Sequence, residues 1–316
     1  MRISIAMATY NGAKFLEEQL NSFLDQTRLP DELIITDDCS SDETEEIIVS
    51  FTQTAPFKVI FSRNNKNLGY CANFNAALMK TTGDLVFLSD QDDVWFPEKI
   101  EHMIAVVEKH PEALVVMNDA ALTDEGLNEV GVTKLGQIKS MGLSVDSFIM
   151  GCCCAARREL LDLCLPISED YNSHDRWIVK FADGLNAKIV DRRVLQYYRR
   201  HENNESQFIA NRTSKVTKWH RYIQVMVKSY KSDVAVYDGK LEQQVLLLKG
   251  INRAAENNDK YRSEFAIMRQ DAEKIVFRLK IRKNNFAKRV LAAFSHFVFG
   301  GDKDYRIRSL VMDILG

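Results

Sequence analysis

A dense group of carboxylates, Asp90-Gln91-Asp92-Asp93, follows directly after the apolar run at 85–88. Four apolar residues in succession are typical of a buried strand, which would bring the carboxylates to the edge of a sheet. Three like charges within four residues repel one another unless a cation compensates them, and oxygen ligands of this kind suit Mg²⁺ or Mn²⁺. The group therefore predicts a divalent-cation site, with a solvated acidic turn as the alternative.

A second polar run, residues 37–42 (DDCSSD), follows another apolar segment. The loop at the carboxyl end of a parallel strand is where α/β proteins bind ligands. A carboxylate such as Asp38 suits a ribose hydroxyl or a base N–H at that place, whereas the two serines and Asp42 suit helix capping. A plain turn followed by a helix cap is the alternative interpretation.

Two further runs carry groups that could do chemistry, residues 173–177 (SHDRW) and 197–204 (YYRRHENN). The first run places the carboxylate of Asp175 between polar groups and an indole, although a lone aspartate is more often a cap or a surface charge. In the second run, Arg199 and His201 together could bind a phosphate or complete a metal site. A lone histidine is more often structural.

Elements that could position these groups alternate over the first 120 residues in the pattern of β-α-β units around a mainly parallel sheet, which predicts an α/β fold. The expected strands are 3–8, 32–36, 58–62, 85–88 and 114–117, and the expected helices are 13–26, 42–51, 70–80 and 99–109. Beyond them we expect a loop over 123–142, a helix over 157–164, and short strands at 188–190 and 195–198. After about residue 208, Lys, Arg, Gln, Leu and Val recur at helical spacing to near the end, which predicts a separate helical region.

Taken in order, the motifs resemble the large glycosyltransferase family 2, and within it the bacterial rhamnosyltransferase-like members. The motifs are Thr9-Tyr10-Asn11-Gly12, the run 37–44 (DDCSSDET), Asn67-Leu68-Gly69, Asp90-Gln91-Asp92-Asp93 with Trp95, His174-Asp175, and Arg199 with His201. The resemblance covers roughly residues 1–205. It implies the nucleotide-binding GT-A fold, a Mn²⁺ or Mg²⁺ cofactor, and inverting transfer of a sugar from a UDP- or dTDP-sugar.

The resemblance also implies roles for residues that would bind the donor. Thr9 and Tyr10 match the place where the first strand meets the pyrimidine base, and Asp38 matches a carboxylate that holds the base or ribose. A later segment matches the part that closes over the nucleoside. The whole donor-binding set expected on this basis is Thr9, Tyr10, Asn11, Asp38, Asn67, Gly69, Asn73, Asp90, Gln91 and Arg199.

For the reacting groups, Asp92 matches the direct metal ligand and His201 a further ligand that some members use, while Arg199 is expected to face the diphosphate. Asp175 matches the catalytic base. Many members have Glu-Asp where this chain has His174-Asp175, as the rhamnosyltransferase-like group often does. The residues expected on the acceptor side are Gly151, His174 and Trp177.

Charge divides the chain into two parts that nearly cancel to a net charge of -2. Residues 1–208 carry 20 Lys and Arg against 33 Asp and Glu, whereas residues 209–316 carry 22 against 11. We therefore expect a catalytic domain over 1–208, with donor-binding and acceptor-binding halves of about 1–95 and 96–208, and a basic helical region over 209–316.

The basic region mixes bulky apolar and cationic residues at helical spacing over 274–299. This pattern is typical of a helix that lies in an anionic bilayer interface. Packing of the same residues against the catalytic domain or a second subunit in a homo-oligomer is the alternative. We expect no nucleic-acid partner, because the isoelectric point is about 6.3 and no binding motif is present.

The expected location is the cytoplasm, peripherally at the inner-membrane face, because the start is too short for a signal peptide and no apolar run could span a bilayer. Six cysteines without paired spacing predict buried reduced thiols. Family habit implies a lipid-linked glycan acceptor in O-antigen or capsule synthesis. A nucleotidyltransferase would instead show a Gly-rich basic loop near the first strand, and a binding module without activity would have lost the metal carboxylates or the base.

Overall fold

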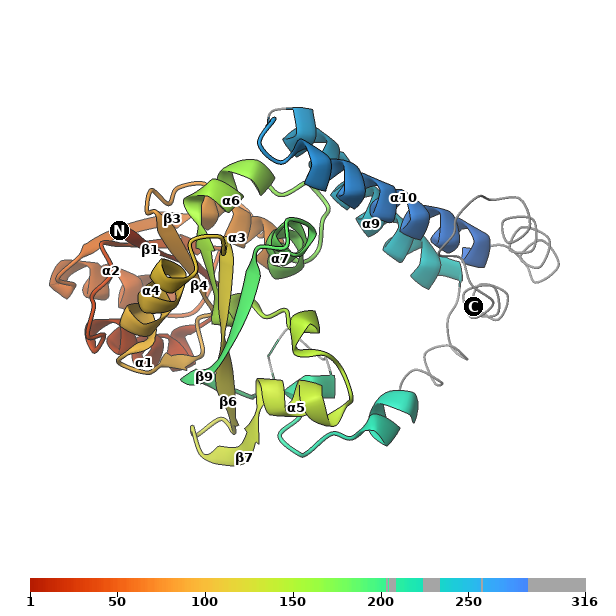
Figure 1. Ribbon diagram of the computed structural model, residues 1–316. Helices are drawn as coiled ribbons and strands as arrows, with labels where there is room; N and C mark the ends of the chain where they lie inside the picture. The colour runs from red at the N-terminus through yellow and green to blue at the C-terminus, as the bar shows by residue number, and fades with distance from the viewer. Residues whose placement is uncertain (203, 205–208, 224–233, 257, 284–316) are drawn as a thin grey trace. The chain divides into compact units, whose positions relative to one another are not determined.

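The computed structural model describes residues 1–202, 204, 209–223, 234–256 and 258–283 (Figure 1). The chain divides into two compact units, Met1–Arg221 and Tyr222–Gly316, whereas the charge pattern suggested a division at 208. The first unit ends later than 208 because residues that follow 208 pack and hydrogen-bond within it. Val216 is buried, and the side-chain amide of Gln137 donates to the carbonyls of Arg212 and Ser214 at 3.0 and 2.8 Å.

The first unit is an α/β structure, as expected. Its strands are β1 (Ile3–Thr9), β2 (Glu32–Asp37), β3 (Lys58–Arg63), β4 (Leu85–Ser89), β5 (Val94–Trp95), β6 (Val115–Thr123), β7 (Glu129–Thr133), β8 (Cys154–Arg157) and β9 (Lys188–Arg199). Its helices are α1 (Ala13–Leu24), α2 (Thr44–Thr54), α3 (Tyr70–Leu78), α4 (Lys99–Lys109), α5 (Lys134–Ser140), α6 (Arg158–Cys164) and α7 (His174–Gly184), with short 3-10 turns at Val145–Ser147, Gly151–Cys153 and Ile209–Asn211.

One sheet connects these strands in the order β3-β2-β1-β4-β8-β6-β9-β5, with β7 paired to β6. The first four strands in that order are parallel, and β8 then runs antiparallel to both β4 and β6. Because β1 has β2 on one side and β4 on the other, the chain changes direction across the sheet at β1. A crevice at such a switch point, beyond the carboxyl ends of the strands, is the usual ligand site of an α/β sheet.

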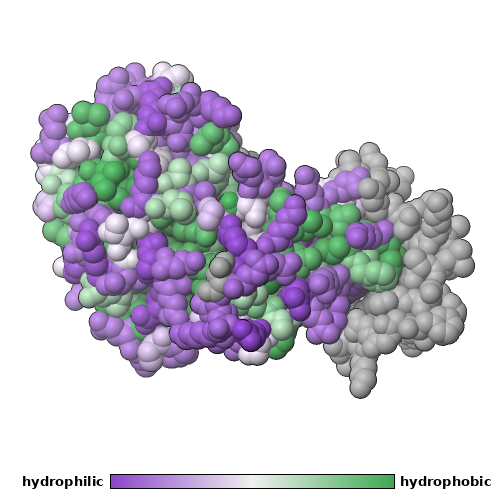
Figure 2. All heavy atoms as spheres, turned by 90° about the horizontal axis from the view of Figure 1, so that it is seen from above, coloured by the Kyte–Doolittle hydropathy of each residue, from purple (hydrophilic) through white to green (hydrophobic). Residues whose placement is uncertain are grey.

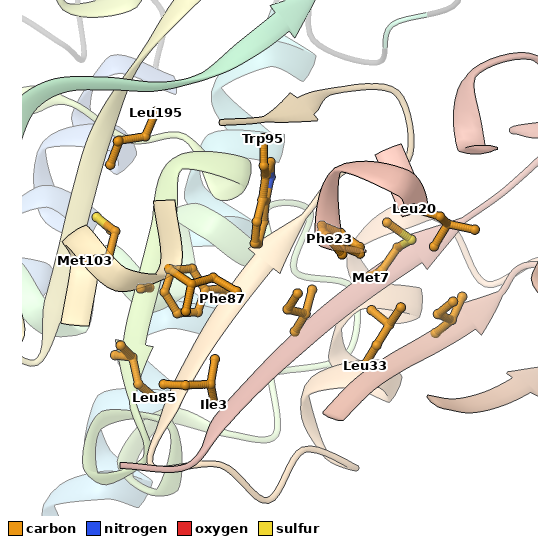
Figure 3. Close-up of a cluster of buried hydrophobic side chains, with 14 of the residues drawn as sticks. Ile3, Met7, Leu20, Phe23, Leu33, Leu85, Phe87, Trp95, Met103 and Leu195 are labelled. Carbon is orange, nitrogen blue, oxygen red and sulfur yellow. The ribbon is translucent and has the colours of Figure 1, made fainter. Parts of the chain in front are cut away.

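Alternate residues of the parallel strands define the main core, since successive side chains of a strand point to opposite faces. On one face, side chains such as Ile5, Met7 and Phe87 form a cluster with residues of α1, α2 and α4, and the Trp95 ring contacts those of Phe23 and Phe87 (Figure 3). On the other side, α3 packs on β1 and β2. The parallel strands are thus covered on both faces, which explains why their sequences are almost continuously apolar.

The acceptor-side half departs from the expected elements. The segment 123–142 is not a loop, because it holds β7 and α5, and the two short strands expected at 188–190 and 195–198 are one continuous strand, β9. The consecutive cysteines 152–154 lie in a 3-10 turn and at the start of β8, and the six cysteines are thiols rather than disulfides. Five of them are buried as expected, whereas Cys39 is only half-buried.

The second unit contains a pair of helices, α9 (Val234–Glu256) and α10 (Arg262–Lys283), which pack against each other. Buried residues recur at helical spacing on both, at Leu247 and Ile251 on α9 and at Phe265 and Met268 on α10. Within the described residues, no helix combines the length and the apolar character needed to cross a bilayer. The predicted interfacial run continues to 299, and its part beyond 283 lies outside the described residues.

Replacing Phe87 by Ala should destabilise the first unit by about 3–5 kcal/mol, because the ring is fully buried beside Trp95 and its loss leaves a cavity. Thermal unfolding followed by circular dichroism measures the change. Met79→Ala is the control, since that side chain is 54% exposed and its loss should cost less than about 0.5 kcal/mol. Equal melting temperatures for the two variants would contradict this account of the core.

Candidate active site

The loops that follow β1 and β2 are joined by a set of hydrogen bonds. Thr9 donates its hydroxyl to Asp37 at 2.9 Å, and the backbone N–H of Asn11 donates to the Ser40 hydroxyl at 2.8 Å. The side-chain oxygen of Asn11 in turn accepts from the Ser41 N–H at 2.8 Å. Asn11 has a φ of 46°, a left-handed conformation that asparagine tolerates. The predicted base-binding loop is therefore a rigid structure, from which the Tyr10 side chain projects 49% exposed.

Asp38 is buried at the base of the segment that was expected to close over a nucleoside. One of its carboxylate oxygens accepts from the Asn64 side chain and the Leu68 N–H, and the other accepts from the Gly69 N–H. Gly69 has a φ of 82°, which a residue with a side chain rarely adopts. Asp38 thus holds this segment in place, and its second oxygen keeps one further lone pair for a ligand donor.

Two other members of the expected donor-binding set support the same region. Asn73 is buried and donates its amide to the carbonyls of Thr9 and Thr36, which ties the ends of β1 and β2 together. Asn67 accepts from the Gly69 N–H at 3.0 Å, within its own loop. The polar atoms of Asn73 therefore serve the scaffold.

Gln91 connects the carboxylate group after β4 to the loop after β1. Its side-chain amide accepts from the Tyr10 N–H at 2.9 Å and donates to the Tyr10 carbonyl at 3.0 Å. A Cβ added at Gly12 would lie 2.3 Å from the same amide, so glycine leaves the space that Gln91 fills. Tyr10 and Gln91 consequently meet at the switch point of the sheet.

The side chain of Asp92 contacts two residues that follow β9. Its carboxylate contacts the imidazole of His201 at 2.7 Å and accepts from the Asn204 amide at 3.0 Å. The structure therefore brings together the two expected metal ligands, which are 109 residues apart. Asn204 belongs to the run 197–204, but its residue type gave no sign that it would bind Asp92.

Arg199 supports the carboxylate turn. Its guanidinium donates to the backbone carbonyls of Asp92 at 2.9 Å and Glu125 at 2.7 Å, and it pairs with Glu18 and stacks on Phe15. Because the side chain is buried and each guanidinium nitrogen has a protein acceptor, Arg199 holds the turn in place. A contact of Arg199 with the diphosphate stays a prediction.

Asp90 and Asp93 lie side by side beneath Asp92, together with the thiol of Cys152. One ligand atom of each of these three side chains lies within 4.8 Å of the others. Burial and the Asp92 charge raise the pKa of Asp90 to about 7, and burial and the neighbouring carboxylates also raise the pKa of Asp93. Burial therefore disfavours the ionised forms of Asp90 and Asp93, and a cation held beside them would favour those forms. Carboxylate oxygens with a histidine nitrogen are a donor set that fits Mn²⁺ or Mg²⁺.

The expected base, Asp175, lies in the first turn of α7. One oxygen of its carboxylate accepts from the Ser173 hydroxyl and the Arg176 N–H, both at 2.6 Å. A Cβ added at Gly151 would lie 3.5 Å from the Asp175 Cβ, and the thiol of the next residue, Cys152, lies beside Asp90 and Asp93. Asp175 on α7 and the carboxylates after β4 therefore lie on either side of the turn at Gly151 and Cys152.

His174 is buried beside the expected base, stacked on Phe74 with ring centroids 3.8 Å apart. Neither of its ring nitrogens has a hydrogen-bond partner among the described residues, and burial lowers its pKa to about 4. A Cβ added at Gly151 would lie 2.7 Å from His174 Nε2 and 3.5 Å from the Asp175 Cβ. Gly151 and His174 therefore lie next to Asp175, as the acceptor-side expectation requires.

Trp177 does not face this region. Its side chain is fully buried between Tyr171 and Phe181, and its indole N–H donates to the Cys164 carbonyl at 2.8 Å. Trp177 therefore anchors α7 in the core. Its role on the acceptor side stays a prediction.

Comparison with known families decides what kind of protein carries this site. The model of the family described as Glycosyl transferase family 2 matches residues 4–164, which is just over half of the chain. The chain belongs to glycosyl transferase family 2. This confirms the resemblance seen in the motifs and identifies the protein as a glycosyltransferase.

Among similar curated proteins, a dTDP-rhamnosyl transferase of Shigella flexneri, RfbG, is 28% identical over 248 residues, covering 72% of this family 2 member and 82% of RfbG. An abequosyltransferase of Salmonella typhimurium, RfbV, is 39% identical over 95 residues, covering 29% of this chain and 28% of RfbV. With other relatives the chain aligns over a third to a half of their length, such as 45% of a putative glycosyltransferase of Bacillus subtilis, EpsE.

Solved structures share the fold of this family 2 member at low identity. TarS of S. aureus in complex with UDP-GlcNAc matches with a TM-score of 0.56 at 18% identity, over 100% of this chain and 90% of that chain. The mannosyltransferase PcManGT of Pyrobaculum calidifontis, in complex with GDP-Man and Mn²⁺, matches with a TM-score of 0.50 at 17% identity, over 99% and 84%. The likeness confirms the expected GT-A fold.

Replacing His174 by Phe should make stability less sensitive to acid. The folded-state pKa of about 4 lies below the ordinary value of 6.5, so the neutral imidazole contributes stability above pH 6.5 that is lost as the pH falls toward 4. A phenylalanine can stack on Phe74 without titrating. Urea unfolding of both proteins between these pH values should show a steeper loss for the wild type, and parallel curves would contradict the buried neutral state of His174.

Proposed function

We propose that this glycosyltransferase moves a hexose or deoxyhexose from a UDP- or dTDP-sugar to a hydroxyl of a glycan acceptor, with inversion at the anomeric carbon and with a divalent cation. The observation that carries the proposal is that two carboxylate groups lie on either side of the turn at Gly151 and Cys152, since a Cβ at Gly151 would lie 3.5 Å from the Asp175 Cβ and Cys152 lies beside Asp90 and Asp93. The turn at Asp90–Asp93 supplies one group, and Asp175 on α7 supplies the other.

The donor fits the loops that follow β1, β2 and β4. Tyr10 offers an exposed ring for a base, and Asp38 keeps an oxygen lone pair beside the segment that ends in Gly69. Asp92 and His201 would hold Mn²⁺ or Mg²⁺ beside the diphosphate. When bound, such a cation would neutralise the negative charge that develops on the leaving nucleoside diphosphate.

Asp175 supports a single displacement. One of its carboxylate oxygens is held by Ser173 and the Arg176 N–H, which orients the group and leaves the other oxygen to take the proton of an acceptor hydroxyl. As that proton moves to Asp175, the hydroxyl oxygen forms its bond to the anomeric carbon and the bond to the diphosphate breaks. Gly151 and His174 lie beside Asp175, where we place the acceptor.

The names of relatives support the substrate class. RfbG is a dTDP-rhamnosyl transferase and RfbV an abequosyltransferase, so both names specify a deoxysugar. TarS was solved with UDP-GlcNAc, which is a uridine nucleotide donor. We propose a deoxyhexose or hexose on a pyrimidine nucleotide as the donor, and a lipid-linked oligosaccharide of O-antigen or capsule synthesis as the acceptor.

Asp175→Asn should lower transfer by about 10²–10⁴-fold while donor binding stays unchanged, because the amide cannot take a proton but keeps the shape of the side chain. A screen of nucleotide sugars by thermal shift with Mn²⁺ and Mg²⁺ first identifies the donor. Transfer to a lipid-linked acceptor extract is then measured for both proteins. Asp162→Asn is the matched control, since Asp162 is exposed on α6 and 66% of its side chain is accessible. Unchanged transfer by Asp175→Asn would remove Asp175 as the base.

The basic C-terminal region would bring the enzyme to the cytoplasmic face of the inner membrane. On α10, Ile267, Ile275 and Phe277 are exposed among cationic residues such as Lys280, and polar and apolar side chains intermingle over the face seen in Figure 2. Exposed apolar residues beside cations suit an anionic bilayer surface.

Flotation with vesicles that contain anionic phosphatidylglycerol tests the membrane proposal. The full chain should float with these vesicles and less with neutral phosphatidylcholine ones, because each cation near an anionic surface contributes about 1 kcal/mol. The substitutions Ile275→Ser and Phe277→Ser should reduce flotation, whereas Ile251→Val in the buried face of α9 should not. Equal recovery with both vesicle types would favour packing or a homo-oligomer, which sedimentation would detect.

A further inference from the structure

We propose that Lys99 and Gln196 form a positioning relay that holds the Asp90–Asp93 turn in the geometry that binds a divalent cation. The inference rests on the proposed cation site at Asp92, and it concerns two residues that touch neither donor nor acceptor in the proposed function. Neither residue was marked by any motif in the sequence.

Lys99 is fully buried at the first position of α4, an unusual place for an ammonium group. Its Nζ donates to the Cys152 carbonyl at 2.8 Å and to the side-chain oxygen of Gln196, and it lies 3.8 Å from the Trp95 ring centroid. Two acceptors and an aromatic face together satisfy a charged ammonium. The site is therefore built around the cationic form of Lys99.

Gln196 connects Lys99 to the acidic turn through hydrogen bonds of its side-chain amide. Its side-chain oxygen accepts from Lys99, and its Nε2 donates to Asp93 at 2.8 Å. Because an ammonium can only donate, the oxygen of the Gln196 amide must face Lys99, and the amide nitrogen then faces Asp93. All three side chains are fully buried, so water does not compete for these hydrogen bonds.

Asp93 is linked in turn to the expected metal ligand. Its other oxygen accepts from the Arg199 N–H at 3.3 Å, and the Arg199 side chain donates to the Asp92 carbonyl at 2.9 Å. The backbone of Asp92 is therefore held from β9 on the same side as the relay. A displaced Asp93 would release this connection and move the carboxylate of Asp92 relative to His201.

Positioning and plain electrostatics predict opposite results for the same substitution. If Lys99 acted only as a nearby positive charge, its removal would strengthen the binding of a cation. If the relay positions the turn, its removal weakens cation binding even though a repelling charge is gone. Gln196→Met separates the two further, because it breaks the relay without changing any charge.

The experiment measures Mn²⁺ binding to the full chain, alone and with UDP, by the electron paramagnetic resonance signal of free Mn²⁺. Lys99→Met and Gln196→Met should each weaken binding by about 10–100-fold, the usual effect of losing a residue that orients a metal ligand. The double variant should bind Mn²⁺ at most about twofold more weakly than Lys99→Met, since the effects of substitutions within one network are not additive. Thermal unfolding confirms that each variant is folded.

Lys134→Met is the matched control. Lys134 is a second buried lysine, on α5, which donates to Asn211 and makes no hydrogen bond to the acidic turn within the described residues. Its loss should lower stability and leave Mn²⁺ binding unchanged. Should Lys99→Met fail to fold, Gln196→Met decides alone.

The possible failures are distinguishable. If the Asp92→Asn variant binds Mn²⁺ as tightly as the wild type, the cation lies elsewhere. This result would overturn both the proposed cation site and the relay. Binding that depends on Asp92 but is unchanged or tighter in Lys99→Met and Gln196→Met would overturn the relay and leave the proposed function standing. Weaker binding in both variants, with Lys134→Met at the wild-type value, supports the relay.

Discussion

Repulsion among the carboxylates of Asp90, Asp92 and Asp93 is the constraint on which the rest of this structure depends. Buried like charges destabilise a fold unless donors and cations compensate them. Here Asp92 is met by His201 and Asn204, and Asp93 by Gln196 and the Arg199 N–H. These partners belong to β9 or follow it, so a large part of the second half of the sheet serves the turn after β4.

The donor and acceptor halves are joined by this arrangement. Strand β9 runs parallel to β6 and ends at Arg199, whose side chain donates to the carbonyl of Asp92. Strand β8 pairs with both β4 and β6 and carries the Cys152 turn to the carboxylates. Because a sheet is stiff across its hydrogen-bonded strands, the carboxylate turn and the Asp175 helix are held by one framework. Such rigidity is what positions catalytic groups for a displacement.

The donor half follows closely from local sequence. Strands β1 to β4 begin where expected and extend one residue further, because each is a short apolar run between turn residues, and α4 has the expected bounds. The strands of the half expected to bind the acceptor follow less directly from the sequence. Strands β7 and β8 are short and lack clear alternation, and β9 carries charged residues at 191–193 that divide its pattern into two. These strands form because neighbouring strands satisfy their backbone groups, which depends on pairing partners far along the chain.

The amino-acid sequence by itself determined the family, the carboxylate turn and the division into an acidic and a basic part, and it marked Asp175 as the expected base, because ordered motifs and charge are properties of residue types. Only the tertiary structure decided that His201 meets Asp92, that Arg199 and Trp177 serve the scaffold, and that Lys99 lies buried beside Gln196. The physical reason is that a side chain's partners are set by packing between distant segments. A buried lysine and an exposed one are identical in sequence, and only the surrounding acceptors distinguish them.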